Sequence, residues 1–278
     1  MTFIATVGNY DYRYTWIFHQ DGVIEFDVAM TGILLMAGTE VDRCRSCDQP
    51  NPAPGRVKLT GDERFGTLVG RNTIAVNHQH FVNLRLDFDV DGTANSIKEI
   101  NASKVRGRHA NPYGNAWEAA QTIFGRERDA RRDLNPATHR HWAIFNPGSR
   151  TALGHYPSYL LEPGGNALPL LGAKTRPRQL LGFINHAFHA TRLHPRQQFA
   201  GGEYPNQIRF ADNVETWAND NESIHQQDLV VWYTLGMTHI PRPEELPIMP
   251  SARTGFRLVP KGFFDRNPAV DVPEEPSR

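Results

Sequence analysis

The most constraining feature of this sequence is a run of alternating residues from Asn77 to Gly92. Apolar side chains and two histidines occupy the even positions up to Val90, and polar or charged side chains occupy most odd positions. Successive side chains of a β-strand point to opposite faces, so this period of two predicts one long strand with one buried face. His78 and His80 share the parity of the apolar residues, so an unbroken strand would point both imidazoles into a core.

A second alternating run extends from Asp228 to His239. His239 again shares the parity of apolar residues, whereas Asp228 has the opposite parity, and Pro241 ends the pattern. Two histidines at i and i+2 on a strand, with a third on another strand, can reach one metal ion, and neutral imidazole suits copper and zinc. The alternative is that these histidines are ordinary polar residues, hydrogen-bonded at strand ends.

The rest of the chain predicts many short strands. The turn at Asp21-Gly22 lies between two extended segments and predicts a hairpin over residues 13–36. Residues 40–62 are predicted as a polar, proline-rich loop. Residues 116–133 are ambiguous, although their alanines and Arg/Glu run would suit a helix. We therefore predict an all-β fold, a large antiparallel β-sandwich with long loops, in which residues 1–278 form one domain.

Composition excludes several classes of partner. Lys plus Arg equals Asp plus Glu, at 30 each, so no basic field favours nucleic acid, and no apolar stretch is long enough to span a bilayer. Neither a signal peptide nor a peroxisomal tripeptide is visible, so the compartment stays unassigned. The only two cysteines, Cys44 and Cys47, are too few for a zinc site and predict a surface loop with two thiols or a local disulfide.

Tyrosines of strands are mostly packing residues, and spacing alone does not distinguish Tyr10 from Tyr12 or Tyr14. The surrounding motif does, because the chain resembles the C-terminal catalytic domain of copper-containing primary-amine oxidases. The fixed positions of that family's cofactor motif are matched by Thr6, Asn9, Tyr10, Asp11 and Tyr12. Further matches follow in order along almost the whole chain, including 64–68, 77–80, 85–92, 191–192, Trp232, His239, 247–250 and 262–265.

The resemblance implies a specific chemistry. Tyr10 would be the precursor of topaquinone, which accepts a primary amine as a Schiff base, with Asn9 and Asp11 positioning it. The copper ligands would be His78, His80 and His239. The reaction would convert a primary amine, O₂ and water to an aldehyde, ammonia and H₂O₂.

The resemblance also implies a second metal, most readily calcium, away from the copper. Its ligands would be the carboxylates and carbonyls of Asp87, Phe88, Asp89, Asp228 and Leu229. A further calcium site of part of the family would correspond to Glu127, Asp220 and Glu222. The alternative is that these acids simply face solvent, as acids on strand edges commonly do.

The family's catalytic base and smaller N-terminal domains lie upstream of the cofactor motif, so the resemblance predicts that this chain lacks them, together with the first strands of the sheet. It also predicts a homodimer with hairpin arms, and over residues 116–133 it favours a strand with a charged loop instead of a helix. Two functions therefore stay open. One is a primary-amine oxidase, and the other is a catalytically incomplete fragment that acts at most as a copper-binding β-domain.

Overall fold

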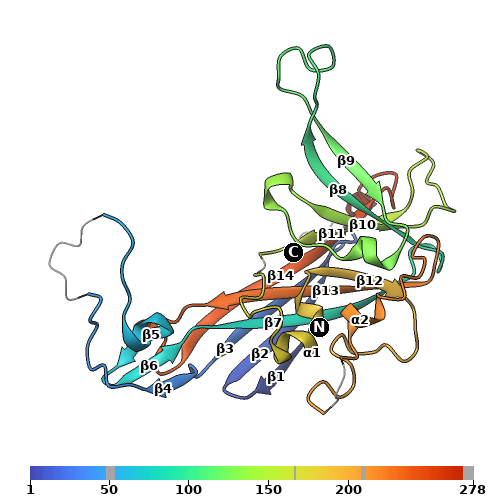
Figure 1. Ribbon diagram of the computed structural model, residues 1–278. Coiled ribbons are helices and arrows are strands. Elements are labelled where there is room, and N and C mark those ends of the chain that lie inside the picture. Colours follow the sequence, from blue (N-terminus) through green and yellow to red (C-terminus); the bar gives the residue numbers. More distant parts are fainter. Residues whose placement is uncertain (48–53, 166, 208–210, 272–278) are drawn as a thin grey trace, which may run out of the picture. The chain divides into compact units, whose positions relative to one another are not determined.

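The computed structural model describes residues 1–47, 54–165, 167–207 and 211–271 (Figure 1). Strands hold 42% of the chain and helices 11%, and the strands form antiparallel sheets. The predicted all-β class is therefore confirmed. The predicted loop at 40–62 includes residues 48–53, which lie outside the described residues.

The strands are β1 (Thr2–Val7), β2 (Tyr10–Phe18), β3 (Ile24–Gly32), β4 (Met36–Gly38), β5 (Gly66–Gly70), β6 (Thr73–Val76), β7 (His78–Phe88), β8 (Ser96–Lys104), β9 (Trp117–Ile123), β10 (His141–Phe145), β11 (Ser158–Pro163), β12 (Phe188–Arg192), β13 (Leu229–His239) and β14 (Met249–Lys261). The helices are α1 (Arg176–Leu180), α2 (Val214–Trp217) and the short 3-10 turns η1 (Gly61–Arg64), η2 (Glu127–Ala130), η3 (Pro136–Thr138), η4 (Gly182–Ile184), η5 (Pro243–Glu245) and η6 (Pro268–Asp271).

The strands of the described residues form three sheets. The largest has the order β1-β2-β3-β14-β11-β10-β8-β9, and the other two have the orders β12-β13-β7 and β4-β6-β5. By contacts within the chain, the residues divide into two compact units. The first unit comprises Met1–Trp16, Phe26–His80 and Met237–Thr254, and the second comprises Ile17–Glu25, Phe81–Gly236 and Gly255–Arg278.

The core of the second unit lies between two of these sheets. Trp142 of β10 stacks on Phe188 of β12 with ring centroids 4.5 Å apart, and Tyr233 of β13 meets Phe256 of β14 at 5.1 Å. Trp142, Phe188 and Tyr233 are fully buried. Aromatic side chains of both sheets therefore interdigitate, as expected for a sandwich.

In the same unit, β8 and β9 pair along seven residues of each strand, from Lys98–Ile123 to Lys104–Trp117. Figure 1 shows this hairpin (green) extending beyond the strands that follow it. Every residue of β9 is exposed. Residues 116–133 are therefore a strand followed by the η2 turn, and the helical alternative is wrong.

The alternation predicted for β7 is confirmed over the second half of the strand, whereas most residues of the first half are half-buried on both parities. Leu84, Leu86 and Phe88 are buried, whereas Arg85 and Asp87 between them are exposed. This burial pattern fixes the register that orients the histidines at the start of the strand.

For β13 the expectation of one polar face is wrong, because Leu229–Gly236 is buried on both faces, whereas His239 is buried as its parity predicts. Tyr233 packs on the aromatic core described above, and Trp232 on the opposite face packs with Val214 and Val230. The physical reason is position: β13 is the middle strand of its sheet.

Two other sequence expectations can be compared with the structure. Cys44 and Cys47 form a disulfide, with their Cα atoms 5.3 Å apart, so the disulfide alternative is confirmed. Among the described residues, no helix has the length and apolar character needed to cross a bilayer.

Candidate metal centre

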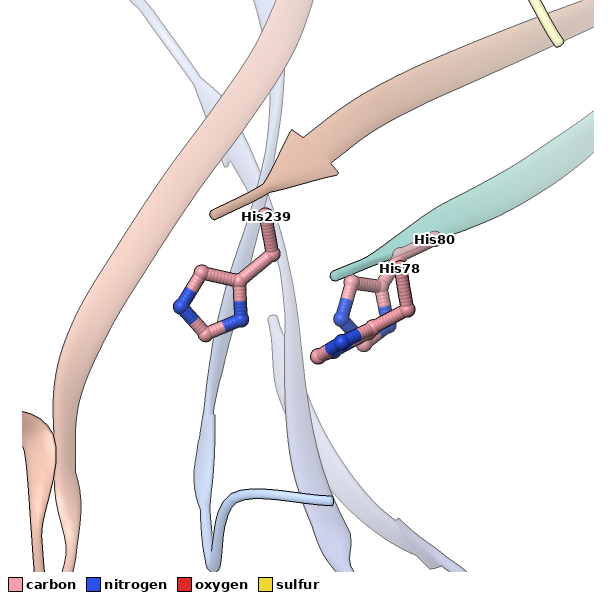
Figure 2. Close-up of side chains that lie close together, drawn as sticks. All are labelled: His78, His80 and His239. Carbon is pink, nitrogen blue, oxygen red and sulfur yellow. The ribbon is translucent and has the colours of Figure 1, made fainter. Parts of the chain in front are cut away.

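Three histidines from two strands converge in the first unit. His78 and His80 begin β7, His239 ends β13, and Figure 2 shows their rings turned toward a common space. One ring nitrogen of each lies within 4.8 Å of the others. The amide of Gln79 donates to the Thr238 hydroxyl at 2.8 Å, which aligns these two strand ends. The structure therefore brings together all three histidines that the sequence singled out.

The hydrogen bonds determine which nitrogen of His78 is available. A carbonyl can only accept, so the 2.7 Å contact with the Val76 carbonyl places a proton on His78 Nδ1 and leaves Nε2 with a lone pair. The Nδ1 of His80 contacts the Tyr12 hydroxyl at 2.8 Å. The Nε2 of His80 is buried and has no hydrogen-bond partner among the described residues. A metal ion would supply the partner that this atom lacks.

The electrostatic environment keeps these rings neutral. Burial lowers the pKa of His78, and burial together with the neighbouring histidines lowers the pKa of His80 to about 4. Neutral imidazole is the form that binds a metal, so at neutral pH no proton competes at these two rings.

Tyr10 lies against the same histidines. Its hydroxyl is 3.0 Å from His78 Nε2 and 3.2 Å from His239 Nδ1, and the residue is 3% exposed. Burial, followed by the charges of Tyr12 and Glu245, raises the pKa of Tyr10 to about 12. The phenol is therefore protonated at neutral pH, and a cation at the three nitrogens would favour its phenolate.

The other tyrosines of β2 occupy different positions. Tyr12 contacts His80 from the side, and Tyr14 stacks on Phe3 with ring centroids 4.8 Å apart. Tyr10 is thus the tyrosine of this strand whose hydroxyl meets two of the three candidate ligands.

The residues flanking Tyr10 fix its backbone. The Asn9 amide donates to the Ile33 carbonyl at 2.5 Å, and the Ile33 N–H donates back to the Asn9 carbonyl at 2.9 Å. The Thr6 hydroxyl donates to the Asp11 carboxylate at 2.5 Å across the β1–β2 turn. Both residues predicted to position Tyr10 therefore hold its strand to its neighbours.

One residue of this centre, Glu245, is not predicted by any sequence pattern. Glu245, in the η5 turn, accepts a 2.8 Å hydrogen bond from His239 Nε2 and is 6% exposed. Burial alone would raise its pKa, but the Arg242 N–H and the bond to His239 outweigh burial and lower it. In the sequence this residue belongs to an ordinary Pro-Glu-Glu turn, so no pattern distinguished it.

A separate cluster of acids belongs to the second unit. One carboxylate oxygen from each of Asp87, Asp89 and Asp228 lies within 4.8 Å of the others. Burial, followed by the charges of the other two acids, raises the pKa of Asp228, and its Oδ1 is buried without a partner among the described residues. Phe88 and Leu229, whose carbonyls were predicted to complete the site, lie beside these acids in β7 and β13.

The further predicted calcium ligands are Glu127, Asp220 and Glu222, and their ligand atoms do not all lie within 4.8 Å of one another. Glu127 is 2% exposed and accepts backbone N–H bonds from Arg192 and Glu222, each at 3.2 Å. Burial, followed by a hydrogen bond with Asp220, raises the pKa of Glu127 to about 8. The Glu222 carboxylate instead contacts His194 Nε2 at 2.8 Å. Over the described part of the chain, only the histidine and Asp87 groups bring three such ligand atoms within 4.8 Å.

Comparisons with known proteins identify the family of this chain. A sequence model described as the copper amine oxidase enzyme domain matches residues 1–278. The chain is 35% identical over 278 residues to the peroxisomal copper-containing diamine oxidase 1 of Nicotiana tabacum, and 36% identical over 273 residues to histamine oxidase of Arthrobacter globiformis. Each match covers 98% of this chain, but only 33% and 37% of those proteins, so the chain spans about a third of their length.

A solved structure gives the same relationship. The copper-containing benzylamine oxidase of Hansenula polymorpha superposes with a TM-score of 0.86 at 30% sequence identity. That match covers 98% of this chain and 40% of the solved chain.

Proposed function

This chain belongs to the copper amine oxidase family, and from that premise we propose that it oxidises primary amines with copper and a quinone derived from Tyr10. The observation that carries the proposal is the place of the Tyr10 hydroxyl, 3.0 Å from His78 Nε2 and 3.2 Å from His239 Nδ1. The match of one enzyme-domain description to residues 1–278 supports treating them as a single catalytic domain.

The copper would be held by Nε2 of His78, Nε2 of His80 and Nδ1 of His239. Two of these atoms face the Tyr10 hydroxyl, and the third is the buried nitrogen without a partner. Three imidazoles leave a coordination position open, as catalytic sites require. When bound, copper and the quinone would supply the redox chemistry that takes a primary amine, O₂ and water to an aldehyde, ammonia and H₂O₂.

The chain's own residues would orient and shield the reacting ring. Tyr10 packs in a cluster with Leu34, Ala75 and Met249, which excludes water from one side of the ring. Asn9 is hydrogen-bonded to Ile33, which fixes the backbone from which the Tyr10 ring extends. Such positioning commonly accounts for a large share of enzymatic rate enhancement.

Two calcium sites and a dimer belong to the same proposal. The unpartnered Oδ1 of Asp228 supports a cation held with Asp87 and Asp89. A second cation with Asp220 and Glu222 is supported by proximity, since Glu127 hydrogen-bonds Asp220 and accepts the backbone N–H of Glu222 at 3.2 Å. The exposed strand β9 of the β8–β9 hairpin supports a homodimer in which this hairpin contacts the partner.

The test uses the full chain and a matched pair of variants. Copper(II) is added in air, and a visible chromophore that reacts with phenylhydrazine is monitored. We expect the chromophore in the parent and in Tyr14→Phe, whose hydroxyl is away from the histidines, and none in Tyr10→Phe. Amine-dependent H₂O₂ is then assayed with histamine, benzylamine, methylamine and a diamine, since the relatives' names differ in substrate.

The outcomes separate the two functions. Chromophore with amine-dependent peroxide supports the oxidase. Copper binding without chromophore or turnover supports the copper-binding β-domain instead. A chromophore that persists in Tyr10→Phe would refute the assignment of Tyr10.

A further inference from the structure

A buried carboxylate stands directly behind one of the three histidines. Glu245 Oε2 lies 2.8 Å from His239 Nε2, on the side of the ring away from Tyr10. The same oxygen accepts the backbone N–H of Arg242 at 3.0 Å, and the other oxygen accepts its Nε–H at 3.2 Å. Both oxygens of Glu245 are therefore fixed, and the side chain is 6% exposed.

This contact decides the protonation pattern of His239. An ionised carboxylate only accepts hydrogen bonds, so the proton of the neutral ring must reside on Nε2. The lone pair is then on Nδ1, which faces the Tyr10 hydroxyl at 3.2 Å. Without an acceptor behind it, the ring could adopt either tautomer and a wider range of orientations.

The three histidines differ in the group that contacts the ring nitrogen opposite the proposed metal-binding nitrogen. His78 is backed by the Val76 carbonyl, and His80 is backed by the Tyr12 hydroxyl, which are both uncharged. Only His239 is backed by a carboxylate. A carboxylate behind an imidazole fixes the ring and raises the basicity of the opposite nitrogen, so it strengthens metal binding.

We propose that Glu245 is a positioning residue of the metal centre, which holds His239 as the Nε2–H tautomer and presents Nδ1 to the ion. This inference rests on the proposed copper site. It extends that site to the Arg242–Glu245 turn, which lies outside the cofactor motif and outside the histidine pair.

A purely structural role is the competing explanation, because Glu245 also closes the η5 turn through the Arg242 N–H. The two roles differ in what they affect. A turn-closing residue affects stability, whereas a positioning residue also affects the tautomer of His239 and the affinity for the ion.

The experiment measures copper(II) affinity of the full chain under argon, by competition with a chromophoric chelator, so that dioxygen chemistry does not contribute. Glu245→Ala should bind copper about 10–100-fold more weakly than the parent. Glu245→Gln keeps an oxygen that can accept from His239 but lacks the charge, so its loss should be smaller. Glu244→Gln, at the exposed neighbouring position, is the control and should bind within about twofold of the parent.

A second measurement separates positioning from folding. Nitrogen-15 NMR of the metal-free protein should show His239 as the Nε2–H tautomer in the parent and in Glu245→Gln. In Glu245→Ala it should show a mixture of tautomers. Circular dichroism establishes that each variant is folded, and if Glu245→Ala is not, Glu245→Gln decides the question against Glu244→Gln.

The results distinguish this inference from the proposal that it rests on. A parent that binds no copper refutes the copper site itself. A parent that binds copper, with a folded Glu245→Ala of equal affinity or unchanged tautomer, refutes only the role of Glu245. Equal affinities of Glu245→Gln and Glu244→Gln refute it in the same way when Glu245→Ala does not fold.

Discussion

Replacing Gly32 with alanine should displace Tyr10 without touching any histidine. Gly32 ends β3 with φ of +130°, and a Cβ atom there would lie 2.9 Å from Tyr10 Cα and closer still to the Asn9 carbonyl oxygen. Both neighbours are backbone, which cannot rotate away as a flexible side chain can. Because carbon atoms in contact rest at roughly 3.5–4 Å, Tyr10 Cα would have to withdraw by roughly 0.5–1 Å.

The size of the effect follows from this displacement. A side chain at a φ that only glycine tolerates costs about 1–3 kcal/mol, and the overlap adds about 1–3 kcal/mol more. In a protein of this size, that corresponds to a fall of roughly 5–15 °C in Tm. A shift approaching 1 Å in a reacting group can lower a rate by about 10²-fold, so formation of the Tyr10-derived chromophore should slow by that order.

The assay compares Gly32→Ala with Gly38→Ala, whose added Cβ would meet nothing within 4 Å. Thermal unfolding gives Tm, and the chromophore is followed after dioxygen is admitted to copper-loaded protein. Copper affinity should stay near that of the parent, because the three histidines lie on β7 and β13. If Gly32→Ala matched Gly38→Ala in both Tm and chromophore rate, the reasoning from this close approach would be refuted.

Two further predictions concern the acids of the second unit. Burial, then the bond with Asp220, raises the pKa of Glu127 to about 8 from 4.5, so the folded protein keeps a proton that the unfolded chain releases. The free energy of unfolding that this proton contributes is lost as pH rises through about 8. Glu127→Gln should therefore flatten the fall in unfolding free energy between about pH 5 and 8, measured by urea denaturation in EDTA, and parallel curves would contradict this. Asp228→Asn should abolish a calcium-induced rise in Tm, which at a hundredfold excess over Kd reflects about 2.7 kcal/mol. Asp91→Asn should retain it, so equal shifts in the two variants would exclude the site.

The inward placement of two ligands could be predicted from the sequence because it depends on a local rule. In β7 the apolar residues on one parity require burial, and that requirement orients His78 and His80 together. The same rule was insufficient for β13, whose central position buries Trp232 as well as Tyr233. Alternation of apolar and polar residues identifies a strand with one buried face. It gives no such information for a strand that is buried on both faces.

The remaining parts of the site depend on contacts that no local pattern contains. Glu245 reaches His239 only because the chain turns back after β13 through η5. Which tyrosine of β2 meets the histidines is set by the packing of that strand, and spacing alone left it open. The close approach of Gly32 to Asn9 is likewise a property of the assembled strands.

These non-local contacts bear on whether the three histidines form a metal centre or are ordinary polar packing. Two of them have one ring N–H bonded, His78 to the Val76 carbonyl and His239 to Glu245, and both turn a lone pair toward the Tyr10 hydroxyl. That hydroxyl has one proton, so it can donate to only one of the two. For the third, the buried Nε2 of His80 has no partner among the described residues, and such an atom costs about 1–3 kcal/mol. Ordinary packing would leave that cost uncompensated, whereas an ion bound to all three rings would remove it. Tyr10 lies 68 residues from His78 and 229 from His239, so the ion would stabilise contacts that exist only in the folded chain. Copper should therefore raise the stability of this protein even where it supports no turnover.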